Sequence, residues 1–247
     1  VAKQPPDGHT ILVSSNTHVV NLSFFTKLPY DPFKDFEPIS LVGTIPFVLT
    51  INATTPARTT REFIEYARGQ AGKPITYGTA GIGTPHHLGA ELLKTMTGIE
   101  MTHVPYKGAA GIVPALVASE ITMTIGAINS LLPHIRAGRL RALAVAAPTR
   151  TELLPDVPTI AESVPAPGYA IDIWIGILAP AGTPRPIVDR WNAELNRIVR
   201  DPPTVKDKLN PIGIEPVGTT PERYMEIMQA DAVRYAKIAK DANIKPE

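Results

Sequence analysis

The stretch from Tyr77 to His87, YGTAGIGTPHH, contains the clearest chemical signal in the sequence. A short apolar run ends there, glycines follow, and Thr84-Pro85 has the residue types of a helix N-cap and first turn. Glycines let backbone N–H groups converge, and a helix start adds unpaired donors at the positive end of the helix dipole. The pattern indicates a site for a carboxylate or phosphate, although an ordinary capped strand–helix turn also explains it.

Two further segments have the same setting. Ser14-Ser15-Asn16-Thr17-His18 offers hydroxyl and amide groups to a ligand oxygen, yet these residues are also favoured in turns and caps. Val104–Gly108 contains Lys107, which either pairs with an anion or stays solvated. All three segments follow an expected strand and precede an expected helix. Ligands of open α/β sheets bind at the carboxyl ends of strands, so the shared setting strengthens the interpretation.

Catalytic and metal-binding motifs are missing from the sequence. There is no cysteine, no HExxH and no GxSxG, and the adjacent His86 and His87 point to different helix faces. The glycine loop matches neither a P-loop nor GxGxxG. We therefore expect no catalytic residue, no metal and no cofactor. A Ser/His hydrolase stays an alternative, because triads assemble in space rather than in sequence.

Composition excludes several classes of protein. The 247 residues are 44% apolar, which is globular and fits one large domain or two small ones. Lys and Arg number 24 against 23 Asp and Glu, so the net charge of +1 argues against nucleic-acid binding. No apolar run reaches the length of a membrane span.

Short apolar segments alternate with segments that carry helix-start signals. The expected strands are 10–15, 39–52, 75–78, 101–104, 121–125, 140–146, 171–179 and 213–217. The expected helices are 59–70, 84–98, 108–119 (regular from about Gly111), 129–137, 183–198 and 220–240. This alternation predicts α/β layers around largely parallel sheets. The long runs 39–52 and 171–179 could each belong to two sheets. Trp174, in the second run, either lines a pocket or packs in the core.

Six segments carry a family resemblance. They are PDGHTIL (6–12), YGTAGIGTPHHL (77–88), HVPYKG (103–108), LPHIRAGRLRALAV (132–145), VPTIAE (157–162) and LAPAGTP (178–184). In collinear order over nearly the whole chain they resemble the Bug-type solute-binding receptors of tripartite tricarboxylate transporters.

The resemblance implies a type II periplasmic binding protein fold of two α/β lobes joined by two crossing strands. Lobe one would be residues 1–52 and 173–247, and lobe two residues 53–172. Such a receptor is periplasmic and a monomer, is not an enzyme, captures a small di- or tricarboxylate or aromatic acid between its lobes, and delivers it to a membrane permease. The family's ligand loops map onto 14–17, 79–84 and 106–108. The expected ligand-binding residues are Ser14, Ser15, Asn16, Thr17, Thr79, Ala80, Gly81, Gly83, Thr84, Tyr106, Lys107 and Gly108, with Ala127 and Trp174 in addition.

Two departures from the family pattern refine these expectations. Many relatives carry FDN before the LPHI helix, with an Asp that can bind a ligand ammonium, whereas this chain has Ile125-Gly126-Ala127-Ile128-Asn129. We therefore expect an organic acid without an amine. The family also places a strand, a loop, a helix and another strand before the PDG segment, and this chain begins at Val1 just before it. We therefore expect a truncated chain without its signal peptide, an incomplete lobe one and an intact lobe two.

Two alternative functions remain open from the sequence. The chain could sense a ligand for a signalling partner instead of a permease. It could also be a small carboxylester hydrolase that uses Ser14 or Ser15, although no catalytic motif surrounds these serines.

Overall fold

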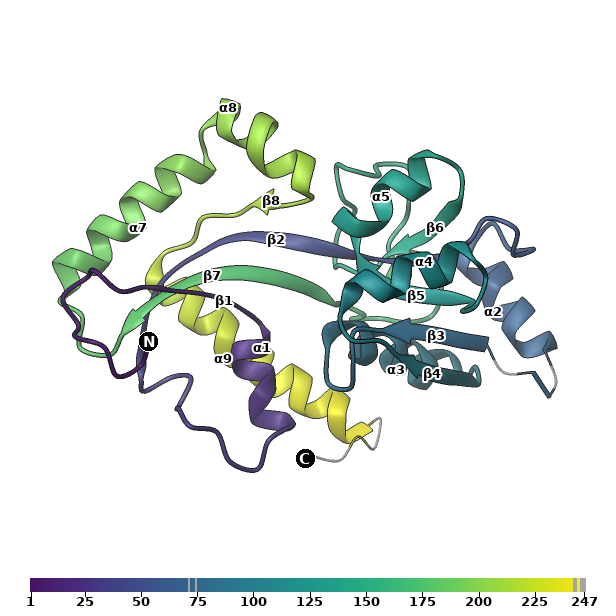
Figure 1. The fold of residues 1–247 in the computed structure, drawn as a ribbon, viewed down its shortest axis with the longest axis horizontal. Helices are drawn as coiled ribbons and strands as arrows, with labels where there is room; N and C mark the ends of the chain where they lie inside the picture. The colour runs from purple at the N-terminus through teal and green to yellow at the C-terminus, as the bar shows by residue number, and fades with distance from the viewer. Residues whose placement is uncertain (71, 74, 242–243, 245–247) are drawn as a thin grey trace. The chain divides into compact units, whose positions relative to one another are not determined.

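The computed structural model describes residues 1–70, 72–73, 75–241 and 244 (Figure 1). The chain forms two compact units. Val1–Ile45 and Ile173–Glu247 form the first, here called the split unit, and Pro46–Asp172 form the second, the continuous unit. The boundary between Ile45 and Pro46 lies earlier along the crossing segment than the predicted Asn52.

The continuous unit is built on one sheet with strand order β6-β2-β5-β3-β4. Its strands are β3 (Ile75–Thr79), β4 (Met101–Pro105), β5 (Met123–Ala127), β6 (Leu140–Val145) and the second half of β2 (Phe36–Asn52). β3 runs parallel to both β4 and β5, whereas β2 runs antiparallel to both β5 and β6. The predicted largely parallel sheet is thus wrong for β2. This strand enters the unit where β5 ends, with Phe47 opposite Ala127, and must therefore run against its neighbours.

Helices of the continuous unit begin at or near the predicted positions, except for one helix that was not predicted. The helices are α2 (Thr60–Gly69), α3 (Pro85–Thr97), η2 (Ala109–Gly111), α4 (Ile112–Val117), α5 (Ile128–Arg136) and α6 (Ile160–Ser163). At the start of α2, the Glu62 N–H donates to the Thr59 hydroxyl (3.1 Å). At the end of α3, Gly98 takes the left-handed conformation that favours glycine (φ +68°). The missed α6 is held by a complete capping box between Thr159 and Glu162.

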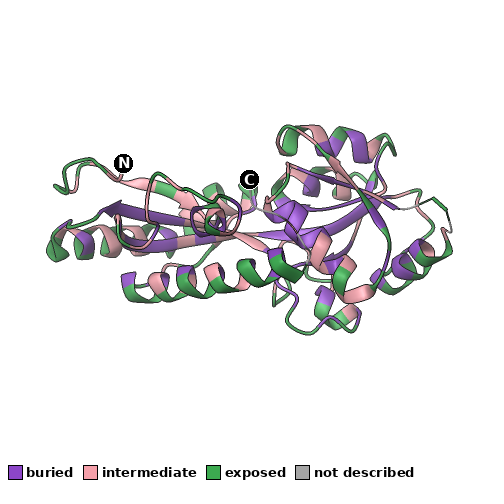
Figure 2. Cartoon of the chain, turned by 90° about the horizontal axis from the view of Figure 1, so that it is seen from below, coloured by how far each residue is buried: buried purple, intermediate pink, exposed green. Residues whose placement is uncertain are grey.

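The split unit packs helices on both faces of a second sheet. β1 (Leu12–Ser15) pairs antiparallel with β7 (Asp172–Pro180), β7 neighbours the first half of β2, and β8 (Glu215–Pro216) pairs antiparallel with β2. The prediction of largely parallel sheets is therefore wrong for this unit. Helix α9 (Pro221–Asp241) covers the face that carries Trp174 and Leu178, and α7 (Arg185–Val199) covers the face that carries Ile39 and Ile177. Within this unit Figure 2 shows buried strands beside helices whose outer residues are exposed.

Short helical segments complete the split unit. They are α1 (Thr17–Val20), η1 (Asn21–Ser23), α8 (Pro202–Thr204), η3 (Val205–Leu209) and η4 (Asn210–Ile212). The sequence predicted the bounds of none of them. The strand predicted over 213–217 shrinks to the two residues of β8, because Gly213 ends η4 with a left-handed conformation (φ +74°).

Candidate functional site

The predicted ligand-binding residues of the continuous unit lie together at one edge of its sheet. Because β3, β4 and β5 run in the same direction, they end at the same edge, with Thr79 opposite Pro105. Each strand leads directly into a helix start: α3 after the glycine loop, η2 after Lys107, and α5 after Ala127. The backbone supports this arrangement, since the Tyr106 N–H donates to the carbonyl of Thr79 (2.9 Å). We call this region the carboxyl edge.

Side-chain hydrogen bonds brace the glycine loop at this edge. The N–H of Gly81 donates to the Thr79 hydroxyl (3.2 Å), and the Thr84 hydroxyl donates to the carbonyl of Gly81 (2.7 Å). Gly81 and Gly83 have φ angles of +124° and +75°, which L side chains rarely adopt. The loop therefore needs glycine at both positions, and its shape is set by its own contacts.

The three helix starts have no side-chain cap. Thr84 occupies the N-cap position of α3, but its hydroxyl donates to the carbonyl of Gly81 and caps no N–H of the helix. The predicted role of its side chain as a cap is therefore wrong. The N-cap residues of η2 and α5 are Gly108 and Ala127, which offer no capping oxygen. The Ser130 N–H in the first turn of α5 donates to Asn129 Oδ1 (2.9 Å), and the other first-turn N–H groups have no N-cap side chain to accept their bonds.

Residues of these helix starts line a common narrow gap that has no room for a water molecule. Its lining includes His86 in the first turn of α3, Ala109 at the start of η2 and Ser130 in the first turn of α5. His86 is only 6% exposed, and its Nδ1 has no hydrogen-bond partner among the described residues. Burial lowers the pKa of His86 to about 4, so the imidazole is neutral near neutral pH. An uncharged, unpartnered nitrogen beside helix starts without side-chain caps is a second polar feature of this edge.

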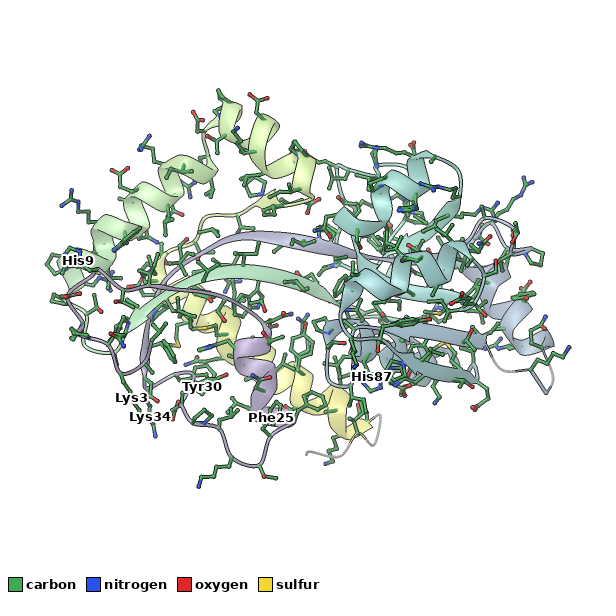
Figure 3. The ribbon with its side chains drawn as sticks, in the orientation of Figure 1. Lys3, His9, Phe25, Tyr30, Lys34 and His87 are labelled. Atoms are coloured by element: carbon green, nitrogen blue, oxygen red, sulfur yellow. The ribbon has the colours of Figure 1, made fainter. Side chains whose placement is uncertain are left out.

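Below the glycine loop lies a stack of aromatic rings. The His103 ring lies 5.1 Å from that of Tyr77 and 4.5 Å from that of His87, between centroids (Figure 3 labels His87). His103 Nε2 lies 2.6 Å from the Thr79 hydroxyl, and the Gly83 N–H donates to His87 Nδ1 (3.3 Å). Burial, and then the charge of His103, lower the pKa of His87 to about 4. The neutral form of His87 can accept this bond, so the stack supports the loop only while it is uncharged.

Lys107 and Tyr106 differ in exposure at the same edge. The Lys107 side chain is exposed and can approach an anion. The Tyr106 ring packs so closely over Gly111 that a Cβ there would lie 2.8 Å from the ring. Tyr106 is therefore a wall of the loop, and burial raises the pKa of its hydroxyl.

In the split unit, the residues of the predicted Ser14–Thr17 cluster make different kinds of contact. The Ser15 and Thr17 hydroxyls bond each other (2.8 Å), and the fully buried Asn16 donates its amide to the Tyr235 hydroxyl (2.9 Å). Ser14 and Thr17 line a hollow of about 480 Å³ together with Lys3 and Tyr30, the latter two labelled in Figure 3. The contacts of Asn16 favour packing over ligand binding.

Trp174 lies in the core of the split unit. It is 2% exposed, its indole N–H donates to the Asp231 carboxylate (2.7 Å), and its ring meets that of Tyr224 edge-on at 5.3 Å. Burial raises the pKa of Asp231 despite Arg234, whose guanidinium lies 2.8 Å away. These contacts favour the second of the two interpretations of Trp174, packing in the core.

Sequence reasoning did not single out His86 or Ser130 as parts of the edge. Their signal was present, because both lie in the first turn of a helix that follows a parallel strand. In the described part of the chain, no group of three His, Cys, Asp or Glu side chains is arranged to hold a metal ion. No helix among the described residues is long and apolar enough to cross a membrane.

Comparison with known proteins decides the family. The model of the tripartite tricarboxylate transporter family receptor matches residues 1–244. The chain belongs to this receptor family. One curated relative is the UPF0065 protein of the tcbD-tcbE intergenic region of Pseudomonas sp. (strain P51). It is 39% identical over 96% of this chain and 70% of the relative. The resemblance seen in the sequence is therefore confirmed.

Solved structures of receptors show the same fold. The R. palustris protein Rpa4515 with adipate is 34% identical and has a TM-score of 0.89, with 100% of this chain and 82% of that chain covered. The periplasmic binding protein BugD is 29% identical with a TM-score of 0.85, over 100% of this chain and 82% of that chain. The predicted periplasmic binding protein fold is confirmed, and the family to which this chain belongs is one of receptors.

Proposed function

We propose that this receptor binds a small organic carboxylate at the carboxyl edge of the continuous unit. The observation that carries the proposal is that three helix starts without side-chain caps follow parallel strands at one edge of the sheet. Free N–H groups and helix dipoles bind anions without an arginine clamp. The adipate bound by the related Rpa4515 supports a carboxylate as the ligand class.

The charges at this edge favour an acid without an amine. Lys107 contributes a positive charge, and the segment Ile125–Asn129 contains no carboxylate. An ammonium group on the ligand would therefore meet the positive ends of helices and a lysine without a matched acceptor.

Aspartate and succinate test this selectivity, because they share a carbon skeleton and differ by the ammonium group. We expect isothermal titration calorimetry to show that succinate binds about tenfold more tightly, which corresponds to about 1.4 kcal/mol. Equal or tighter binding of aspartate would contradict the proposal.

A matched pair of lysine variants tests the location. Lys107 follows β4 at the carboxyl edge, whereas Lys73 precedes β3 at its opposite end, and both are exposed. We expect Lys107→Ala to weaken dicarboxylate binding several-fold and Lys73→Ala to leave it unchanged. The same loss in both variants would indicate long-range charge effects instead of a local contact.

We further propose that Ser14 and Thr17 of the split unit take part in ligand binding, and that the receptor works in the periplasm and passes the ligand to a membrane permease. Support comes from the hollow that these two residues line and from the family. Ligand uptake by cells that carry the permease, with and without the receptor, tests the delivery step. If occupancy changes a signalling output but not uptake, the sensor alternative is correct.

The hydrolase alternative has less support from the split unit. His18 also lines the hollow of Ser14, but its Nε2 lies 3.2 Å from the carbonyl of Pro32, so this nitrogen is engaged by the backbone. Burial lowers the pKa of His18. Turnover of a chromogenic ester that disappears when Ser14 and Ser15 become alanine would restore this alternative.

A further inference from the structure

Ile82 is the only large apolar side chain of the continuous unit that is exposed among its described residues. It is 58% exposed, and every other exposed large apolar side chain belongs to the split unit. The other large apolar side chains of this unit are buried or partly buried, whereas Ile82 is exposed at the centre of the glycine loop. Isolated exposed apolar residues are common on protein surfaces, so position and rigidity must carry the argument.

The position of Ile82 is fixed by its neighbours. Gly81 and Gly83 flank it with positive φ angles, and hydrogen bonds from Gly81 to Thr79 and from Gly83 to His87 hold the loop on both sides. The side chain therefore cannot turn inward without breaking these bonds. Its exposure is built into the loop and does not depend on a mobile tip.

Ile82 also lies beside the proposed carboxylate position. It precedes the N-cap Thr84 by two residues, and successive Cα atoms are about 3.8 Å apart, so the two Cα atoms are at most about 8 Å apart. A carboxylate at the first turn of α3 would direct its carbon chain over or near this side chain. Ala109 and Ala110, both exposed, add small apolar groups at the neighbouring helix start.

We propose that Ile82 determines ligand specificity by packing against the hydrocarbon part of the ligand, so that the receptor prefers acids with a longer methylene chain. This inference rests on the proposed carboxylate site and adds the class of acid to it. The helix starts bind the charged group, and Ile82 contributes a hydrophobic binding free energy that grows with each methylene it covers. The expected gain is about fourfold in affinity for each methylene that is fully buried.

Succinate and adipate are the probes, because they carry the same two carboxylates and differ by two methylenes. We expect calorimetry to show that the native chain binds adipate about tenfold more tightly than succinate. Ile82→Ser should reduce this ratio to about twofold or less, mainly by weakening adipate, while Ile82→Leu should keep it. The heat-capacity change of adipate binding should become less negative in Ile82→Ser, because less apolar surface is buried.

Val233→Ser is the matched control, since Val233 is 74% exposed on α9 of the split unit. This variant should leave both affinities unchanged. If both acids bind but the ratio is the same in the native chain and in Ile82→Ser, the inference on Ile82 is wrong and the carboxylate site stands. If neither acid binds the native chain, the carboxylate site and this inference fail together.

Discussion

Acid should destabilise the continuous unit through two adjacent buried histidines. His86 and His87 are each 6% exposed, and burial lowers both pKa values from 6.5 to about 4. The unfolded chain then binds more protons than the folded chain between these two values. Stability is therefore complete above pH 6.5 and falls as the pH drops from 6.5 towards 4.

The size of the effect follows from the pKa difference. At about pH 5.5, one unit below the unfolded pKa, each histidine costs about 1.4 kcal/mol relative to about pH 7.5. The two together reduce the free energy of unfolding by about 3 kcal/mol, a large part of the stability of a domain of this size.

Two optical probes separate the units in the assay. Both tryptophans, Trp174 and Trp191, belong to the split unit, so their fluorescence reports its unfolding by urea. Circular dichroism reports both units, and a transition seen only by circular dichroism belongs to the continuous unit. Burial also lowers the pKa of His18 in the split unit and of His103 in the continuous unit, so variants must be compared with the native chain.

His87→Gln is the informative variant, and His9→Gln, at an exposed residue of the split unit, is its control. We expect His87→Gln to remove about 1.4 kcal/mol of the loss between about pH 7.5 and pH 5.5, and His9→Gln to remove none. The reasoning is refuted if the continuous unit loses no stability over this range, or if His87→Gln loses as much as the native chain.

Two predictions concern the core of the split unit. In Gly176→Ala the new Cβ would lie 1.8 Å from the Tyr224 hydroxyl, so urea unfolding should show a loss of about 1–3 kcal/mol. Gly69→Ala, with nothing within 4 Å of its Cβ, should be neutral or slightly stabilising, and equal effects of the two changes would contradict the packing argument. Trp174→Phe removes the N–H that donates to Asp231 and should cost about 1–3 kcal/mol, as measured with the fluorescence of the remaining tryptophan. An unchanged midpoint would show that the buried carboxylate finds another partner.

The helix starts and the strands were predictable because their signals are local. Thr59 with Glu62 formed the expected cap, and the apolar runs other than 213–217 became strands at or near the predicted bounds. The direction of β2 was not predictable, since it depends on where the chain enters the sheet. The bounds of α1 were missed because this helix has only four residues, three of them β-branched, and local preference assigns such a stretch to a strand or turn.

The candidate site was predictable in outline but not in the role of each side chain. Strand-to-helix order predicted a shared strand-end setting for Thr79 and Lys107, whereas Ala127 was named only through the family resemblance. Whether a polar or aromatic side chain faces a ligand or the core depends on distant partners. Asn16 is engaged by Tyr235, more than two hundred residues away in the chain, and the sequence near it contains no sign of this.

The split unit has a consequence for the order of folding during synthesis. β1 pairs with Ile175–Leu178, which leave the ribosome only after the whole continuous unit has been made. The continuous unit can complete its sheet first, since its contacts are local to one stretch of chain. Until then Leu12–Ser15 lacks its β7 neighbour, although closing the long intervening loop costs little extra entropy. The nascent chain thus holds an unpaired early strand during most of its translation, and the arrival of β7 ends that vulnerable period.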